Sequence, residues 1–129
     1  MSRLTSLILG GGLVLALAAC SSGAADNGSA APAASYPPGT PTITAKDIAF
    51  TQRQVEAPAD TSFTLVFQNA DGAPHNVAIV QDGSGSTAFT GEIISGPREV
   101  AYSVPALAPG TYTFRCDIHP DMKGTLVVR

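Results

Sequence analysis

The chain has 129 residues, only 13% of them charged, and a formal net charge of −3 at pH 7. This length leaves room for one small domain after an N-terminal part that does not resemble a folded domain. Seven basic residues against ten acidic ones form no basic patch, so no nucleic-acid partner is expected.

Residues 1–19 have the pattern of a secretory signal peptide. Arg3 precedes an apolar run, residues 7–19, that is too short to cross a bilayer core of ~30 Å comfortably. The closing letters "LAAC" resemble the lipobox of bacterial lipoproteins, which implies that Cys20 is lipidated and anchors the mature chain to a membrane. The alternative is a plain signal peptide cut nearby, with Cys20 left as a free thiol or in a disulfide with Cys116.

Residues 20–41 comprise the expected lipidated Cys20 and a linker. The linker consists mainly of Ala, Ser, Gly and Pro. Such a composition has almost nothing to bury and predicts a disordered tether. The lipobox and the tether together predict an extracytoplasmic domain, periplasmic or on the outer cell surface, held at a bacterial membrane. The domain itself, residues 42–129, is long enough for a single hydrophobic core.

Within the domain, apolar residues alternate or cluster in short runs between Gly, Pro, Asn and Asp, and no helical period persists. Expected strands are 42–50, 53–57, 62–69, 75–82, 87–91, 99–105, 111–116 and 124–129. About eight short strands at this spacing predict an all-β fold, a Greek-key two-sheet β-sandwich. In "LAPGTY", Tyr112 is expected to bond its hydroxyl to upstream backbone, as in a tyrosine corner.

The last turn of the domain carries a rare set of side chains at regular spacing. Cys116, His119 and Met122 follow one another at three-residue steps, and His75 opens an earlier strand. Once processing has removed the initiator methionine and modified Cys20, no other Cys, His or Met remains. One thiolate, two imidazoles and one thioether are the ligand set of a blue-copper electron-transfer site.

Zinc is the chemical competitor for these donors, because a Cys and two His also hold Zn²⁺ tetrahedrally. The thioether of Met122 adds little for Zn²⁺ but suits Cu(I), and the site lacks the open water position that hydrolysis needs. Taken singly, each donor is also compatible with a structural role, as a turn histidine, a loop methionine or a buried cysteine. As a set, they favour one copper ion.

"FQNADGAPHNVAIV" followed by "PGTYTFRCDIHPDMKGTLVV" resembles the cupredoxins, the blue copper proteins, through essentially the whole predicted domain. The short ligand loop looks most like that of amicyanin, a plastocyanin-like member of the family. The resemblance implies that Asn76 joins the two ligand loops by hydrogen bonds. It implies these copper ligands: His75 Nδ1, Cys116 Sγ, His119 Nδ1 and a weak axial Met122 Sδ.

The expected activity is electron transfer without enzymatic turnover. Two histidines in the chain leave none for a second copper centre with reductase or oxidase chemistry. The competing class is a copper-handling protein for delivery, buffering or resistance, and a third class, an adhesion sandwich, would leave the four donors as coincidence. We expect a monomer that meets an electron donor and an electron acceptor.

These redox partners are expected to dock near His119. In the family, the imidazole edge of the loop histidine reaches the surface through an apolar collar. Here the expected collar is Ala73, Pro74 and Pro120, small apolar residues that adjoin two of the ligands, with Asp117 and Asp121 as an acidic rim.

Overall fold

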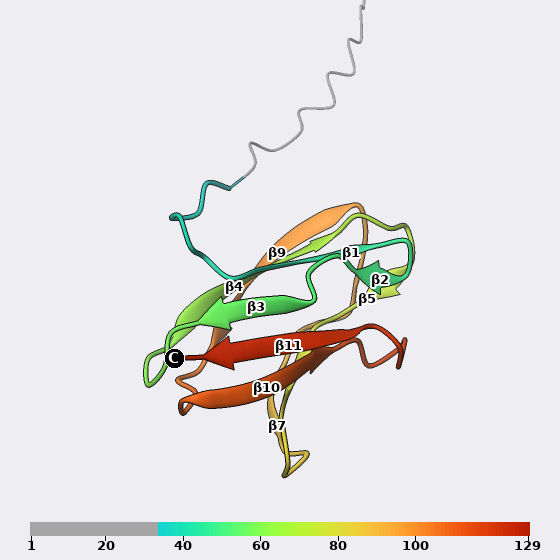
Figure 1. Cartoon of the computed structure of the whole chain (residues 1–129). Helices are drawn as coiled ribbons and strands as arrows, with labels where there is room; N and C mark the ends of the chain where they lie inside the picture. Colours follow the sequence, from blue (N-terminus) through green and yellow to red (C-terminus); the bar gives the residue numbers. More distant parts are fainter. Residues whose placement is uncertain (1–33) are drawn as a thin grey trace, which may run out of the picture. The chain divides into compact units, whose positions relative to one another are not determined.

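Two β-sheets packed face to face form the part of the chain that the computed structural model describes, residues 34–129 (Figure 1). The expected signal peptide, Cys20 and the linker as far as residue 33 lie outside the described residues. Within residues 34–129, no helix has the length and apolar character needed to span a bilayer.

The all-β fold expected from the sequence is confirmed. Eight strands of the described residues have four residues or more, and three have two. The strands are β1 (Thr42–Lys46), β2 (Ala49–Phe50), β3 (Gln54–Ala57), β4 (Phe63–Asn69), β5 (Pro74–His75), β6 (Ala78–Gln81), β7 (Thr87–Thr90), β8 (Ile94–Ser95), β9 (Arg98–Val104), β10 (Gly110–Arg115) and β11 (Lys123–Val128).

The strands are ordered β2-β1-β4-β9 in one sheet and β3-β11-β10-β6-β7 in the other, and β5 pairs with β8 in a small ladder. The pairs β1–β4 and β3–β11 are parallel, and the remaining pairs are antiparallel. Figure 1 shows β5, the turn after β1 and the β10–β11 loop at the same end of the sandwich. Residues that are far apart in the sequence, on β5 and in the β10–β11 loop, are therefore close together in space.

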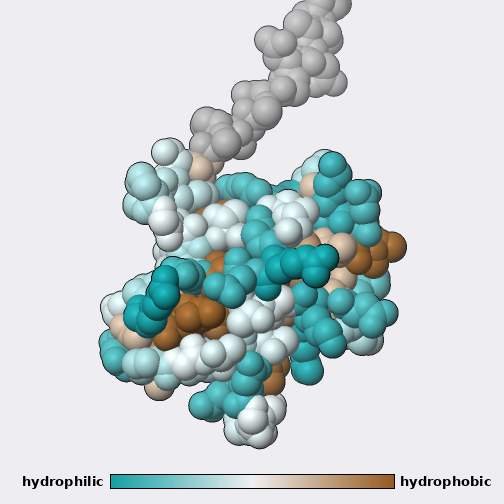
Figure 2. Space-filling view, in the orientation of Figure 1, coloured by the Kyte–Doolittle hydropathy of each residue, from teal (hydrophilic) through white to brown (hydrophobic). Residues whose placement is uncertain are grey.

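The core between the sheets is built on aromatic rings. Phe50 lies edge-on to Phe67 and Phe114, with ring centroids 6.4 and 5.4 Å apart, and Phe67 stacks on Tyr102 at 6.3 Å. Edge-to-face pairs of this kind stabilise a core beyond the area they bury. On the face that Figure 2 shows, hydrophobic colour is confined to separate spots among hydrophilic residues, so this face offers no broad apolar surface.

The expected tyrosine corner is confirmed, because the Tyr112 hydroxyl donates a hydrogen bond of 3.0 Å to the Ala108 carbonyl. The compact unit begins at Ala34, eight residues before the expected boundary at Thr42. Pro41 is buried and its carbonyl accepts a 2.9 Å hydrogen bond from the Val66 amide. The end of the expected linker is therefore packed against β4.

The expected single strand over residues 42–50 is wrong, because the chain reverses direction at Asp47 and Ile48. Both residues have positive φ angles, 54° and 55°, and Lys46 pairs with Ala49 across the turn. A two-residue hairpin turn with left-handed residues matches the twist of the flanking strands, although a β-branched residue rarely adopts this conformation. A tertiary contact of Asp71, described below, overrides the local preference of the sequence.

Candidate metal centre

The structure places His75 on β5, deep inside the end of the sandwich. The imidazole is fully buried (0% exposed), and the residue pairs with Ile94 of β8. Pro74 restricts the backbone directly before it, because the proline ring fixes φ. The short β5–β8 ladder therefore presents the imidazole from a constrained backbone.

Cys116, His119 and Met122 lie in the loop between β10 and β11. The Cys116 amide donates to the Met122 carbonyl and the Met122 amide donates to the His119 carbonyl, both at 2.9 Å. These two bonds close the loop on itself. Cys116 and Met122 are buried, whereas His119 keeps part of its imidazole accessible.

Three of the expected donor atoms converge on one point. The Nδ1 atoms of His75 and His119 are 3.1 Å apart, and Cys116 Sγ lies 4.0 and 3.7 Å from them, respectively. Metal–nitrogen bonds of about 2.0 Å and a metal–sulfur bond of about 2.3 Å in a trigonal plane would put such atoms about 3.5–3.8 Å apart. The spacing and chemistry of these donors fit a single metal ion.

The structure buries Met122 in the loop that also carries Cys116 and His119. Its role as a weak axial ligand stays a prediction. A thioether added to a thiolate and two imidazoles is the donor combination that favours copper over zinc.

Asn76 connects the two segments that carry the donors. Its side-chain Nδ2 donates to Asp117 Oδ2 at 2.8 Å and to the Gly91 carbonyl at 3.3 Å, while its Oδ1 accepts from the Asp117 amide at 2.9 Å. Asn76 is 1% exposed, so each of these bonds replaces water that the amide has lost. The strand after His75 is thereby fixed to the residue after Cys116.

The acidic rim expected around His119 stays a prediction. The Asp117 carboxylate accepts a hydrogen bond from Asn76 and lies 3.5 Å from Arg115, in a solvent-exposed ion pair. Asp121 is exposed in the same loop. The sequence also gave no reason to single out Ile118, which is 41% exposed next to His119.

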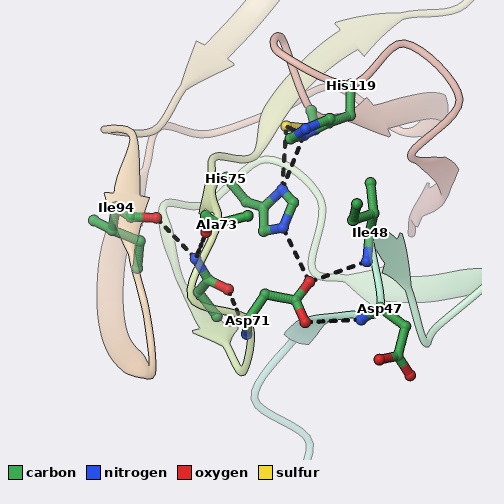
Figure 3. Close-up of polar contacts among 9 residues, drawn as sticks. Asp47, Ile48, Asp71, Ala73, His75, Ile94 and His119 are labelled. Atoms are coloured by element: carbon green, nitrogen blue, oxygen red, sulfur yellow. Dashed lines mark hydrogen bonds and ion pairs between the residues drawn. The ribbon is translucent and has the colours of Figure 1, made fainter.

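Asp71, which no sequence motif singled out, contacts His75 on the side of the imidazole away from Cys116 and His119. Its Oδ2 lies 3.0 Å from His75 Nε2 and also accepts from the Ile48 amide at 3.0 Å, and its Oδ1 accepts from the Asp47 amide at 2.8 Å (Figure 3). The Ile48 amide, followed by that of Asp47, lowers the pKa of the Asp71 carboxyl. The only available sequence signal was a carboxylate four residues before a histidine.

A second buried amide, Asn69, braces the loop that precedes His75. Its Nδ2 donates to the carbonyls of Ala73 and Ile94, both at 2.8 Å, and its Oδ1 accepts from the Asp71 amide at 2.9 Å. Gly96 is required beside it, since a Cβ there would collide with the carbonyl oxygens of Asn69 and Asp71. The loop bearing Asp71 is thus fixed independently of any ion.

A family model described as "Cupredoxin-like domain" matches residues 12–128. Amicyanin from Paracoccus denitrificans is 37% identical over 65 residues, covering 50% of this chain and 48% of that protein. Chloroplast plastocyanin from Physcomitrium patens is 33% identical over 88 residues, covering 63% of this chain and 51% of that protein. The chain spans about half the length of these curated relatives.

Among solved structures, auracyanin A from Chloroflexus aurantiacus, which is described as a "blue" copper protein, matches with a TM-score of 0.61. The match covers 70% of this chain and 98% of auracyanin A at 22% sequence identity. At this identity the likeness shows the fold.

Replacing Asn76 with Ala is expected to lower the free energy of unfolding of the metal-free protein by about 1.5–3 kcal/mol, because hydrogen bonds to a charged group are lost. Denaturant unfolding measures this change. Gln54→Ala, at an exposed position of β3, is the matched control and should stay within about 0.5 kcal/mol of the parent. Equal stability of the two variants would show that Asn76 does not hold the segments together.

Proposed function

The chain belongs to the cupredoxin-like family, and from this membership we propose that it binds one copper ion and carries single electrons between redox partners. The observation that carries the proposal is the convergence of His75, Cys116 and His119 within 4.8 Å of one another, at the end of a rigid sandwich. The description of auracyanin A, which has the same fold, as a blue copper protein supports the choice of metal.

A bound copper ion supplies a one-electron Cu(II)/Cu(I) couple. The protein's part is to keep its donors in one arrangement in both oxidation states. Burial of His75 and Cys116 excludes water, and the hydrogen bonds of Asn76 restrict movement of the two segments relative to each other. Both histidines of the chain belong to this one cluster, so none remains for a second metal centre with enzymatic chemistry.

The proposed route for electrons passes through His119, the partly accessible imidazole of the cluster. Pro120 and Pro74 are exposed apolar residues adjoining the two histidines, and Ile118 exposes 41% of its side chain. Small apolar contacts around a redox centre suit a weak, short-lived encounter between carriers. We propose that both the electron donor and the electron acceptor dock on this face.

Addition of Cu(II) to purified protein comprising residues 34–129 tests the proposal. We expect one equivalent to bind with the intense visible absorption of a thiolate–copper bond, reversible voltammetry and fast electron self-exchange. Tight binding without fast self-exchange would instead favour copper delivery or buffering. Absence of coloured Cu(II) binding would refute the copper proposal.

Substitutions in the ligand loop should separate an essential ligand from a tuning one. Cys116→Ser is expected to abolish the visible charge-transfer band, because that band requires the sulfur, whereas Met122→Leu should remain coloured with a raised reduction potential. Absorption spectra and voltammetry give both results. Retained colour in Cys116→Ser, or lost copper binding in Met122→Leu, would contradict this ligand assignment.

Pro120→Lys is expected to slow electron self-exchange at least severalfold with a nearly unchanged visible spectrum, because a charged side chain obstructs the proposed docking face without touching a donor. The matched control is Pro58→Lys, at an exposed proline beside the far end of β3. Self-exchange measured by NMR line broadening compares the two. Equal rates in both variants would place electron entry on another face.

The extracytoplasmic, membrane-tethered location is also a proposal and rests on the lipobox-like sequence that ends at Cys20. Cys20→Ala, expressed in a bacterium, is expected to move the protein from the membrane fraction to the soluble fraction without changing its copper content. Immunoblots of the two fractions provide the measurement. Continued membrane association of the variant would show that the anchor lies elsewhere.

A further inference from the structure

One carboxylate beside the metal centre connects two backbone amides of one turn with an imidazole on another strand. Asp71 accepts hydrogen bonds from the amides of Asp47 and Ile48 in the β1–β2 turn, and it contacts the Nε2 atom of His75 (Figure 3). The side chain is 16% exposed, and the imidazole it meets is fully buried. The contact with His75 is therefore shielded from water, in surroundings that strengthen it.

The contact determines which nitrogen of His75 carries the proton. An ionised carboxylate has no hydrogen to donate, so Nε2 must carry the hydrogen that joins it to Asp71. In the neutral imidazole Nδ1 is then an acceptor, and this atom faces Cys116 Sγ and His119 Nδ1. The tautomer that can bind a metal through Nδ1 is thus already selected in the metal-free protein.

The turn amides keep this carboxylate ionised and in place. Both amides donate hydrogen bonds to the carboxylate, at 2.8 and 3.0 Å, and bonds of this kind favour its charged form. In return, the carboxylate satisfies two amides of a turn whose residues both have left-handed conformations. Ile48 is β-branched and 57% exposed, so its own packing does not explain the conformation.

We propose that Asp71 is a positioning residue for the metal centre, which fixes the tautomer and orientation of His75 and anchors them to the Asp47–Ile48 turn. The inference rests on the proposed copper function for the identity of the metal. It adds a carboxylate partner to His75 and predicts that Asp71 favours Cu(II) over Cu(I), because a hydrogen-bonded carboxylate makes an imidazole a stronger donor.

The first test is the metal-free full chain, observed by ¹⁵N NMR of its histidine rings. The proposal requires His75 to carry its proton on Nε2 while the neighbouring Asp71 is ionised. A population dominated by the Nδ1-protonated tautomer in the unaltered protein would overturn the proposal, whatever any variant does. This test does not depend on copper, so its failure is distinct from a failure of the proposed function.

The second test is Asp71→Asn in the full chain. Loss of the carboxylate is expected to weaken Cu(II) binding about 10–100-fold, the usual effect of removing the partner of a metal-binding histidine. If the loss falls on Cu(II) alone, each factor of ten raises the one-electron reduction potential by about 59 mV. Competition titration with a chelator and voltammetry measure the two quantities.

Two further variants separate positioning from charge and from folding. Asp47→Asn removes an equal charge from the turn that Asp71 binds but leaves the backbone amide in place. Because Asn tolerates left-handed φ, affinity and potential should stay at parent values. Asp71→Glu keeps a carboxylate and should restore most of the tautomer preference and of the affinity. Parent-like affinity and potential in Asp71→Asn would overturn the proposal. If Asp71→Asn does not fold, Asp71→Glu decides instead: loss of the proton from Nε2 of His75 in that variant would overturn the proposal.

Discussion

The metal centre depends on the approach of two segments that are 41 residues apart in the sequence, and hydrogen bonds between Asn76 and Asp117 maintain that approach. One segment supplies His75 and the other supplies Cys116 and His119. A buried amide that meets a backbone amide and a carboxylate at once can satisfy its polar atoms in few arrangements. The distance between the donors is therefore set by the protein before a metal arrives.

The rest of the fold supports this approach from both sides. Antiparallel pairing of β10 with β11 holds the ends of the ligand loop, and the Phe50, Phe67 and Phe114 rings fill the core beneath it. On the other side, Asn69 and Gly96 allow the loop before His75 to pack closely against β8. Chemically different donors therefore share one rigid end of the sandwich.

Much of this arrangement could be predicted from the sequence, because alternating apolar residues and the rarity of His, Cys and Met are local signals. The strand reversal at Asp47 and Ile48 could not, since an isoleucine in a left-handed turn contradicts its own propensity and is stabilised by a residue far along the chain. The role of Asp71 could not be predicted either, because it also depends on contacts between distant parts of the chain. Its partners are two backbone amides and an imidazole, and neither composition nor residue spacing indicates such contacts.

The parallel pairing of β1 with β4 has a mechanical consequence. Thr42, the first residue of β1, pairs with Val66, and Ala45 pairs with Asn69, the last residue of β4 before the loop that bears Asp71. Tension applied through the N-terminal end of this domain would therefore load the β1–β4 ladder along its length, in shear, with its four residue pairs sharing the force. The loop between β10 and β11 belongs to the other sheet, so the pairs of this ladder lie between the pulled end of the chain and that loop.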